Sequence, residues 1–458
     1  MGTPQIISEV RVRASSTTTR REPLWYHCWA MGPSRANAAA NQPRQTSWLS
    51  IITPGILVAA TGVGAGDLLT ASLAGSKVGI AILWSAVAGS FMKWTLNEGI
   101  ARWQMATDTT LLEGWVTRLG PWIQWVFAPY FLLWSFFVGG ALITACGVAA
   151  ASIFPLGDAT TSKNVWGVIH SLAGLALVWL GGFALFEKLM ASCIAVMFIC
   201  VIATAALLVQ DWSAVAHGLA VPSIPEAGLP WMLGVLGGVG GTVTLLSYGY
   251  WIREKGRSGQ EGVRICRIDL GVAYAVTAIF GVAMIIVGSR VHVEGQGIRL
   301  AGQLSEQLGL VLGPWGQWVF LLGFWGAVFS SLLGVWQSAP YLFADFLALR
   351  RAHSPAEYRT IDLKQTRAYR GFLIAIAVVP MISLWLTVER IQLAYAVMGA
   401  MFMPLLAVTL LLLNNRESWV SSPFRSRWWI NAVLVITVLL FAYMGVLQLR
   451  GLMPSTGG

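Results

Sequence analysis

The chain has 458 residues, of which 56% are hydrophobic and only 11% are charged, and its mean hydropathy is +0.67. Soluble globular proteins carry about 25% charged residues, so this composition excludes a water-soluble protein and indicates a polytopic, all-α membrane protein. The net charge of +10 would suggest a nucleic-acid partner in a soluble chain. In a membrane protein the distribution of charge along the chain matters more, and we expect no nucleic-acid partner.

The first 47 residues contain six arginines and no long apolar core, so they lack the pattern of a secretory signal peptide. We predict a disordered cytoplasmic N-terminal tail over residues 1–47. Met31 is an alternative start, in which case residues 1–30 would be a start-site artefact. We predict a short C-terminal tail over residues 451–458.

Apolar segments follow one another over residues 48–450, and each is long enough to cross a bilayer, which takes about 20 residues. They predict one transmembrane domain of about eleven helices. The predicted spans are residues 48–76, 78–101, 121–150, 164–182, 184–209, 229–252, 268–289, 312–345, 368–387, 391–414 and 428–449.

Lysines and arginines predict the orientation of these spans, because cytoplasmic loops carry an excess of them. With the N-terminus inside, 23 of the 30 lie in inner segments and 6 in outer segments, while Lys93 lies within a span. This asymmetry predicts a cytoplasmic N-terminus. We expect the protein in the plasma membrane, with membrane lipid around it.

Two of the predicted spans contain glycine clusters that disfavour a continuous helix. The first contains VGAGDLLT (63–70), with Asp67 as the one formal charge between Gln45 and Ser76, and the sixth contains GVLGGVGGTVTLL (234–246). A glycine inside a helix costs about 1 kcal/mol relative to alanine. Spans one and six cross in opposite directions, and such paired interruptions are typical of an inverted-repeat transporter whose substrate binds near the bilayer midplane.

Each cluster has an alternative interpretation. In the sixth span, Gly234 with Gly238 and Gly237 with Gly241 form GxxxG patterns, which commonly indicate close helix packing. In the first span, a charge at the bilayer centre costs at least about 3 kcal/mol, which favours a functional role. The alternative there is an ion pair between Asp67 and Lys93.

The stretch TPGILVAATGVGAGDLLTASLAG and the second span, which ends in LNEGIARWQMATDTTLLEGW, resemble the first two helices of the Nramp family, and GAVFSSLLGVW (326–336) extends the resemblance to the eighth span. The resemblance covers about residues 48–450. It implies a leucine-transporter-like fold, in which two inverted five-helix repeats and an eleventh helix enclose broken helices 1 and 6. It also implies proton-coupled transport of divalent metal ions. We therefore expect a transporter and not an enzyme.

This chain differs from the family at the metal-binding motifs. The family's Asp-Pro-Gly-Asn corresponds here to Gly64, Ala65, Gly66 and Asp67, which moves the carboxylate to the Asn position. The family's Met-Pro-His corresponds here to Thr244, Leu245 and Leu246, which removes the sulfur ligand and the histidine. The tenth-span glutamine is replaced around Tyr395 and Ala396.

We therefore predict a substrate site built from oxygen atoms. Asp67 is the expected metal ligand, together with backbone groups near Gly64, Gly66 and Gly241 and the Thr244 hydroxyl. Oxygen ligands suit magnesium, calcium and manganese, whereas sulfur favours softer metals, so manganese, magnesium or iron is the expected cargo. With the sixth-span histidine missing, Asp67 is the candidate carrier of a coupling proton.

We expect no cofactor and no protein partner, since the metal ion is the substrate. The alternative function on the same fold is an H⁺ or Na⁺ symporter of a small organic solute.

Overall fold

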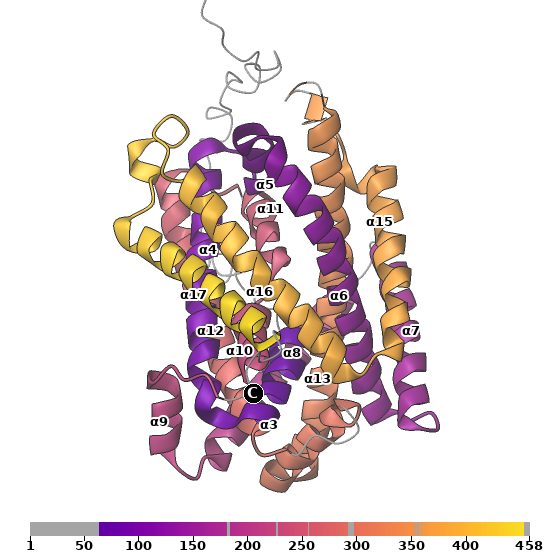
Figure 1. The fold of residues 1–458 in the computed structure, drawn as a ribbon. Coiled ribbons are helices and arrows are strands. Elements are labelled where there is room, and N and C mark those ends of the chain that lie inside the picture. The colour runs from indigo at the N-terminus through magenta and orange to yellow at the C-terminus, as the bar shows by residue number, and fades with distance from the viewer. Residues whose placement is uncertain are drawn as a thin grey trace, which may run out of the picture.

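The computed structural model describes residues 64–180, 184–225, 228–254, 256–291, 297–352, 354, 357–358 and 360–452. These residues form helices joined by turns and bends, with no strand among them (Figure 1). The predicted tail over residues 1–47 and the start of the first predicted span, residues 48–63, lie outside the described residues. So does most of the predicted C-terminal tail, of which residues 451–452 belong to the last helix.

The helices of the first half of the chain are η2 (Ala65–Thr70), α3 (Ala71–Val78), η3 (Gly79–Ile82), α4 (Leu83–Thr107), α5 (Leu111–Gly114), η4 (Trp115–Leu119), α6 (Pro121–Ile153), α7 (Ala159–Leu180), α8 (Ala184–Leu208) and α9 (Trp212–Ala220). Those of the second half are α10 (Leu229–Gly238), η5 (Val243–Leu246), α11 (Ser247–Glu254), α12 (Gly259–Gly288), α13 (Leu300–Arg351), η7 (Leu363–Gln365), α15 (Arg367–Val378), η8 (Val379–Trp385), α16 (Val388–Leu413), η9 (Ser422–Phe424) and α17 (Trp428–Leu452).

Every predicted span from the second onward coincides with one or more of these helices, and the described part of the first coincides with η2 and α3. Within the described residues, nine helical stretches are long and apolar enough to cross a membrane, or ten if the bent pair α8 and α9 is one span. The count is below eleven partly because Gly66–Thr107 is taken as one stretch. It holds the first two predicted spans, which meet at Gly79, where φ is +75°.

The helices of the two five-helix halves pack on one another in equivalent pairs. α3 of the first half packs on α12, and α11 of the second half packs on α4. In the same way α8 packs on α12 and α13, whereas α16 packs on α4 and α6. Each contact of one half therefore has a counterpart in the other, as expected for an inverted repeat. α17 lies outside this pairing, against α16 and α4.

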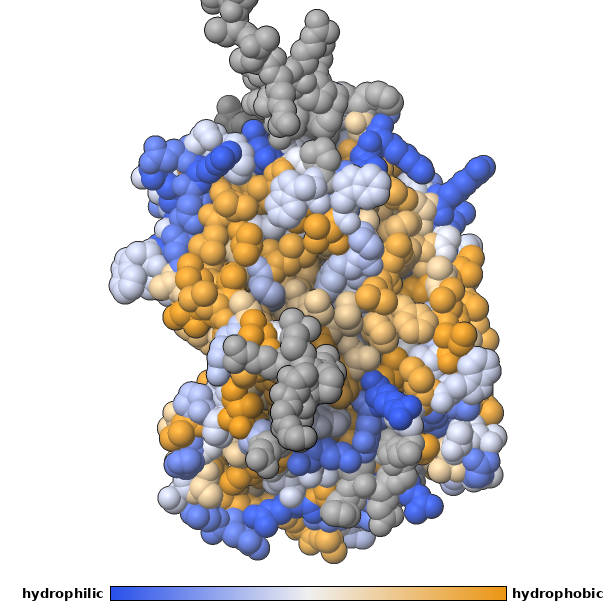
Figure 2. Space-filling model, viewed as in Figure 1, coloured by the Kyte–Doolittle hydropathy of each residue, from blue (hydrophilic) through white to orange (hydrophobic). Residues whose placement is uncertain are grey.

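Large apolar side chains fill the space between the helices. Trp134 on α6 and Trp336 on α13 are fully buried, as is Phe402 on α16. On the face drawn in Figure 2, the surface is also largely apolar over the middle of the molecule, while hydrophilic residues gather toward its top and bottom. This distribution is the one that a bilayer requires, since the hydrocarbon core offers no water to polar groups.

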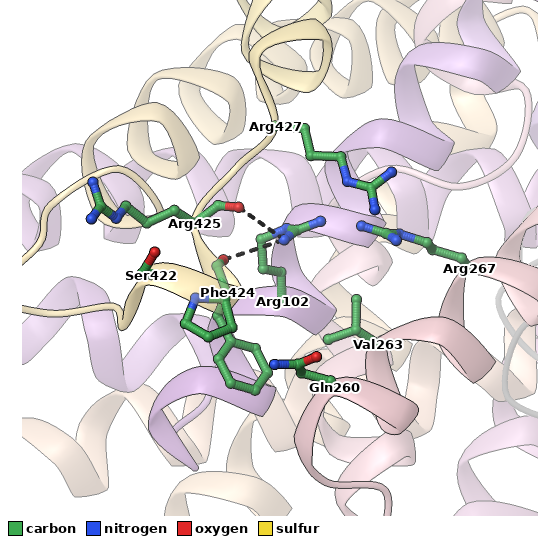
Figure 3. A pocket seen from close by; sticks show the side chains of 9 residues that line it. Arg102, Gln260, Val263, Arg267, Ser422, Phe424, Arg425 and Arg427 are labelled. Atoms are coloured by element: carbon green, nitrogen blue, oxygen red, sulfur yellow. Dashed lines mark hydrogen bonds between the residues drawn. The ribbon is translucent and has the colours of Figure 1, made fainter.

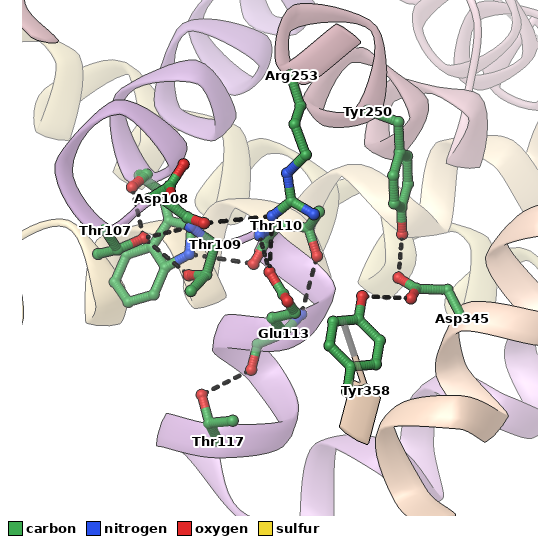
Figure 4. Close-up of polar contacts among 11 residues, drawn as sticks. Thr107, Asp108, Thr109, Thr110, Glu113, Thr117, Tyr250, Arg253, Asp345 and Tyr358 are labelled. Carbon is green, nitrogen blue, oxygen red and sulfur yellow. Dashed lines mark hydrogen bonds and ion pairs between the residues drawn. The ribbon is translucent and has the colours of Figure 1, made fainter. Parts of the chain in front are cut away.

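The basic loops join α11 to α12, α13 to α15 and α16 to α17, and the count of lysines and arginines predicts them to be cytoplasmic. The helix ends that carry them meet at one end of the molecule, drawn at the top of Figure 1, and α9 lies at the opposite end. Arg253, in the last turn of α11, forms an ion pair of 3.0 Å with Glu113 of α5. Tyr358 donates a hydrogen bond of 2.6 Å to Asp345 of α13 (Figure 4). The Arg253–Glu113 pair joins residues 140 apart in the sequence, so the inner ends of distant spans lie together, as the predicted alternation of spans requires.

Candidate functional site

Within the first predicted span, Gly64 is non-helical and forms the first break of the site; from it the chain enters η2, a wide π-helical turn that continues into α3. Gly64 has φ −165° and ψ −114°, and its position lies against α13. A Cβ at this position would be 2.5 Å from Ser331 Oγ. Glycine is required here because no side chain fits between the two helices.

The sixth helix is interrupted over residues 239–242. α10 ends at Gly238, Val239 is extended, and the next helical turn, η5, begins at Val243. Gly240 and Gly241 have φ +79° and +87°, a region that glycine enters at no steric cost. The break therefore follows directly from the second pair of glycines in the cluster.

The preceding glycines of α10 serve close packing instead. A Cβ on Gly237 would lie 2.4 Å from Cα of Ala400 on α16, and one on Gly234 would lie 3.3 Å from Cβ of Ala396. Both interpretations of the sixth-span cluster therefore apply, to different glycines: Gly234 and Gly237 allow close packing, and Gly240 and Gly241 interrupt the helix.

The two breaks face each other directly. A Cβ on Gly66 would lie 2.2 Å from the carbonyl oxygen of Gly238, so backbone lies against backbone. Asp67 is fully buried, and its Oδ2 accepts a hydrogen bond of 3.3 Å from the Gly240 N–H. Its Oδ1 is buried and has no hydrogen-bond partner among the described residues.

Lys93 of α4 is the nearby positive charge, and it is also fully buried. Its ammonium donates to the carbonyl oxygens of Gly237, at 2.8 Å, and of Val239. Within the described residues no ion pair joins Lys93 to Asp67. Lys93 instead holds the last carbonyls of α10, where the negative end of the helix dipole favours a cation.

Polar side chains from three further helices surround the breaks. Trp134 of α6 donates a hydrogen bond of 2.8 Å to the Thr242 hydroxyl. Asn97 of α4 donates one of 2.6 Å to the hydroxyl of Tyr274, whose ring lies 3.2 Å from the position of a Cβ on Gly240. These contacts fix the backbone of the sixth-span break from both sides.

The structure brings the predicted site residues together to different degrees. Gly66 and Asp67 lie in η2 against the sixth-span break, and Gly241 lies within that break. Thr244 is buried in η5, and its Oγ1 would be 3.1 Å from a Cβ on Gly241. The Gly64 carbonyl accepts the Leu68 N–H at 3.1 Å.

Sequence reasoning missed Thr242, which lies in the break itself, and the part played by Trp134 and Tyr274. Nothing in the sequence around Trp134 or Tyr274 distinguishes these residues from other aromatic residues of apolar helices. Thr242 was obscured because the cluster of four glycines left the position of the break open by several residues.

The donor set restricts what could bind. Among the residues that the structure describes, no group of three or more His, Cys, Asp or Glu side chains could hold a metal ion. A cation at the breaks would therefore be bound by one carboxylate with backbone carbonyls and hydroxyls.

A separate polar cluster closes the end of the molecule with the basic loops (Figure 4). Glu113 accepts from the Arg253 guanidinium at 3.0 Å and from the Thr110 N–H at 2.5 Å. Burial lowers the pKa of Arg253, but Glu113 and other nearby groups outweigh it and leave that pKa above its usual value. This cluster ties α5 and α11 together, away from the two breaks.

Comparison with known proteins agrees with this architecture. Residues 55–451 match the family model "Natural resistance-associated macrophage protein-like" (Nramp). A divalent metal cation transporter MntH of Burkholderia ambifaria is 25% identical over 321 residues, which are 67% of this chain and 70% of the relative. One of Acidiphilium cryptum is 24% identical over 303 residues, 61% of this chain and 66% of the relative.

Solved structures show the fold. The manganese transporter of Eremococcus coleocola superposes with a TM-score of 0.67 at 18% identity, covering 93% of this chain and 92% of that one. MhsT in complex with L-phenylalanine superposes with a TM-score of 0.54 at 16% identity, covering 89% of this chain and 99% of that one. These likenesses confirm the predicted leucine-transporter-like fold. Because the family model matches residues 55–451 of the 458 in this chain, the chain belongs to the Nramp family.

Proposed function

We propose that this protein is a secondary transporter that moves divalent metal cations across the membrane by alternating access, with Asp67 as the principal metal ligand. The observation that carries the proposal is the buried Asp67 carboxylate, whose Oδ1 has no hydrogen-bond partner among the described residues, between two facing helix breaks. A buried charge without a partner is costly, and a bound cation would supply that partner. Family membership and the names of the MntH relatives support the same function.

The donors around Asp67 favour hard cations. Thr242 and Thr244 supply hydroxyls, and the interrupted backbone at Gly240 and Gly241 supplies carbonyls. Oxygen donors of this kind suit Mg²⁺, Ca²⁺ and Mn²⁺. We propose Mn²⁺ and Mg²⁺ as the leading cargo and Fe²⁺ after them, with Asp67 as the group that carries any coupling proton.

The arrangement of charge also bears on how the site works. Because Lys93 donates to the carbonyls at the end of α10, its ammonium leaves Asp67 Oδ1 open to a metal ion. Alternating access would move the pieces of the two broken helices relative to their neighbours around this point. We propose that the end with the basic loops faces the cytoplasm of the cell, with the N-terminus on that side of the plasma membrane.

Uptake by proteoliposomes tests the proposal. The purified protein would be reconstituted and uptake of Mn²⁺, Mg²⁺ and Ca²⁺ compared for the native chain, Asp67→Ala and Asp67→Asn. We expect saturable uptake of at least one ion, abolished in both variants, because the carboxylate is the one charged ligand. Glu261→Gln is the control, since Glu261 is 72% exposed and lies away from the breaks.

Normal transport by Asp67→Ala would remove Asp67 from the metal site. If no divalent ion moves although the protein is folded, the metal proposal fails and a small organic solute becomes the substrate to test.

A further inference from the structure

A basic pocket lies away from the two breaks, at the end of the molecule with the basic loops. Its volume is about 270 Å³, just below the usual range for small-molecule pockets. It lies between the inner end of α4, the start of α12 and the segment that joins α16 to α17 (Figure 3). The lining residues are Arg102, Gln260, Val263, Arg267, Ser422, Pro423, Phe424, Arg425 and Arg427.

The pocket carries an excess of positive charge. Four arginines line it, and two carboxylates neutralise part of that charge. Glu98 accepts from both Arg102 and Arg267, and Glu417 accepts from Arg425 at 2.6 Å. Four positive and two negative charges leave an excess of two.

Arg102 gives the pocket a rigid base. It is only 3% exposed, and besides Glu98 it donates to the carbonyl oxygens of Phe424, at 3.3 Å, and Arg425, at 3.0 Å (Figure 3). The segment that carries Arg427 is thereby fixed to α4. The Arg427 guanidinium itself has no hydrogen bond or ion pair within the described part of the chain, so its donors remain available.

The start of α12 adds a second feature that favours an anion. Gln260 lies in the first turn of this 30-residue helix, and the N-cap residue Ser258 makes no side-chain hydrogen bond to the turn. The positive end of a helix dipole and its unpaired N–H groups favour negative charge. The pocket therefore combines this helix start with four guanidinium groups.

Tryptophans place the pocket near the membrane–water boundary. Trp428, which directly follows Arg427, is 82% exposed, and Trp429 stacks on Trp94 with ring centroids 5.8 Å apart. Trp residues concentrate at the headgroup level of bilayers, and basic pockets between helices on the cytoplasmic side bind anionic headgroups.

We propose that this pocket is a binding site for a phosphate group, with Arg427 as its open donor and the headgroup of an anionic phospholipid as the expected source. Arginine suits this role because its planar guanidinium binds phosphate oxygens in pairs. The site is separate from the metal transport proposed above and does not depend on it.

Lipid titration of the purified full-length protein in detergent tests the proposal. Bound lipid would be counted by native mass spectrometry with dioleoylphosphatidylglycerol and, in parallel, dioleoylphosphatidylcholine. We expect the anionic lipid to bind more tightly, and Arg427→Gln to weaken its binding about fivefold, as one interfacial arginine contributes. Arg264→Gln is the matched control, because it also removes one positive charge. Arg264 lies on α12, its side chain is 75% exposed, and it does not line the pocket.

A second arm distinguishes the source of the phosphate. Inorganic phosphate would be titrated by calorimetry into the native protein and both variants. Binding of inorganic phosphate that Arg427→Gln weakens, without preference for the anionic lipid, would keep the phosphate site and overturn the lipid source. Equal loss in Arg427→Gln and Arg264→Gln would show general surface attraction and overturn the site, as would no binding of either probe.

Discussion

At the scale of single residues, the site pairs one buried carboxylate with one buried ammonium that do not contact each other. Lys93 is held by the Gly237 and Val239 carbonyls, and Asp67 is held by the Gly240 N–H. Both residues thus bind the same short segment, residues 237–240, where α10 ends and the break begins. The positive charge of Lys93 opposes a second cation nearby, whereas Asp67 attracts it.

Replacing Lys93 should strengthen metal binding. Lys93→Met keeps a side chain of similar length and removes the charge that repels an incoming divalent ion, so we expect the Kd for Mn²⁺ to fall by on the order of tenfold. Calorimetric titration measures this change, and Lys93→Arg, which keeps the charge, should leave the Kd higher than in Lys93→Met. Weaker binding by a folded Lys93→Met protein would contradict the prediction and show that the ammonium supports the site.

At the scale of helices, the site depends on two backbones that approach without side chains between them. η2 meets α10 at Gly66 and Gly238, and α10 meets α16 at Gly237 and Ala400. Glycine inside a helix carries a propensity cost of about 1 kcal/mol relative to alanine. Here close packing at Gly66 and Gly237 offsets that cost, and Gly240 and Gly241 lie in the break, outside any helix.

Gly66→Ala should disrupt this contact. Its Cβ would lie 2.2 Å from a backbone oxygen of Gly238, which cannot move aside as a side chain can, so we expect about 1–3 kcal/mol of destabilisation and loss of uptake. Thermal unfolding in detergent and proteoliposome uptake measure the two effects. Gly371→Ala on α15 is the control, because a Cβ there meets nothing within 4 Å. A fully stable, transporting Gly66→Ala protein would refute the direct contact of the two breaks.

At the scale of the whole molecule, buried ion pairs join the two halves at the end with the basic loops. Glu98 of α4 accepts from Arg102 of the same helix and from Arg267 of α12, and it is fully buried. It therefore ties the second helix of one half to the second helix of the other. Arg102 is four residues from Glu98 on the same helix, whereas Arg267 reaches it from the other half.

Removing this carboxylate should cost far more than removing an exposed one. Glu98→Gln leaves two arginines without their shared partner, and breaking a buried pair costs about 3–5 kcal/mol. Glu261→Gln breaks a pair of 4.0 Å whose side chains are 75% and 72% exposed, so its effect should stay within about 0.5 kcal/mol. Thermal unfolding of both variants measures the difference, and equal midpoints would mean that the Glu98 cluster does not hold the halves together.

The sequence by itself determined the class of protein, the succession of spans and the place where the sixth helix breaks. These features depend on local patterns: apolar length sets a span, and the glycines at 237–241 weaken a helix wherever it lies. Asp67 stood out for the same reason, as a lone charge in a long apolar run.

Only the tertiary structure decided what Asp67 and Lys93 contact and which glycines pack or break. Lys93 lies 144 residues before Gly237 in the chain, and Trp134 lies 108 residues before Thr242. No local pattern encodes such meetings, because they arise when the two halves fold against each other. The ion pair considered for Lys93 and Asp67 is absent among the described residues for this reason. Packing of α4 against α10 places the Lys93 ammonium at the carbonyl oxygens of Gly237 and Val239, and not at the carboxylate.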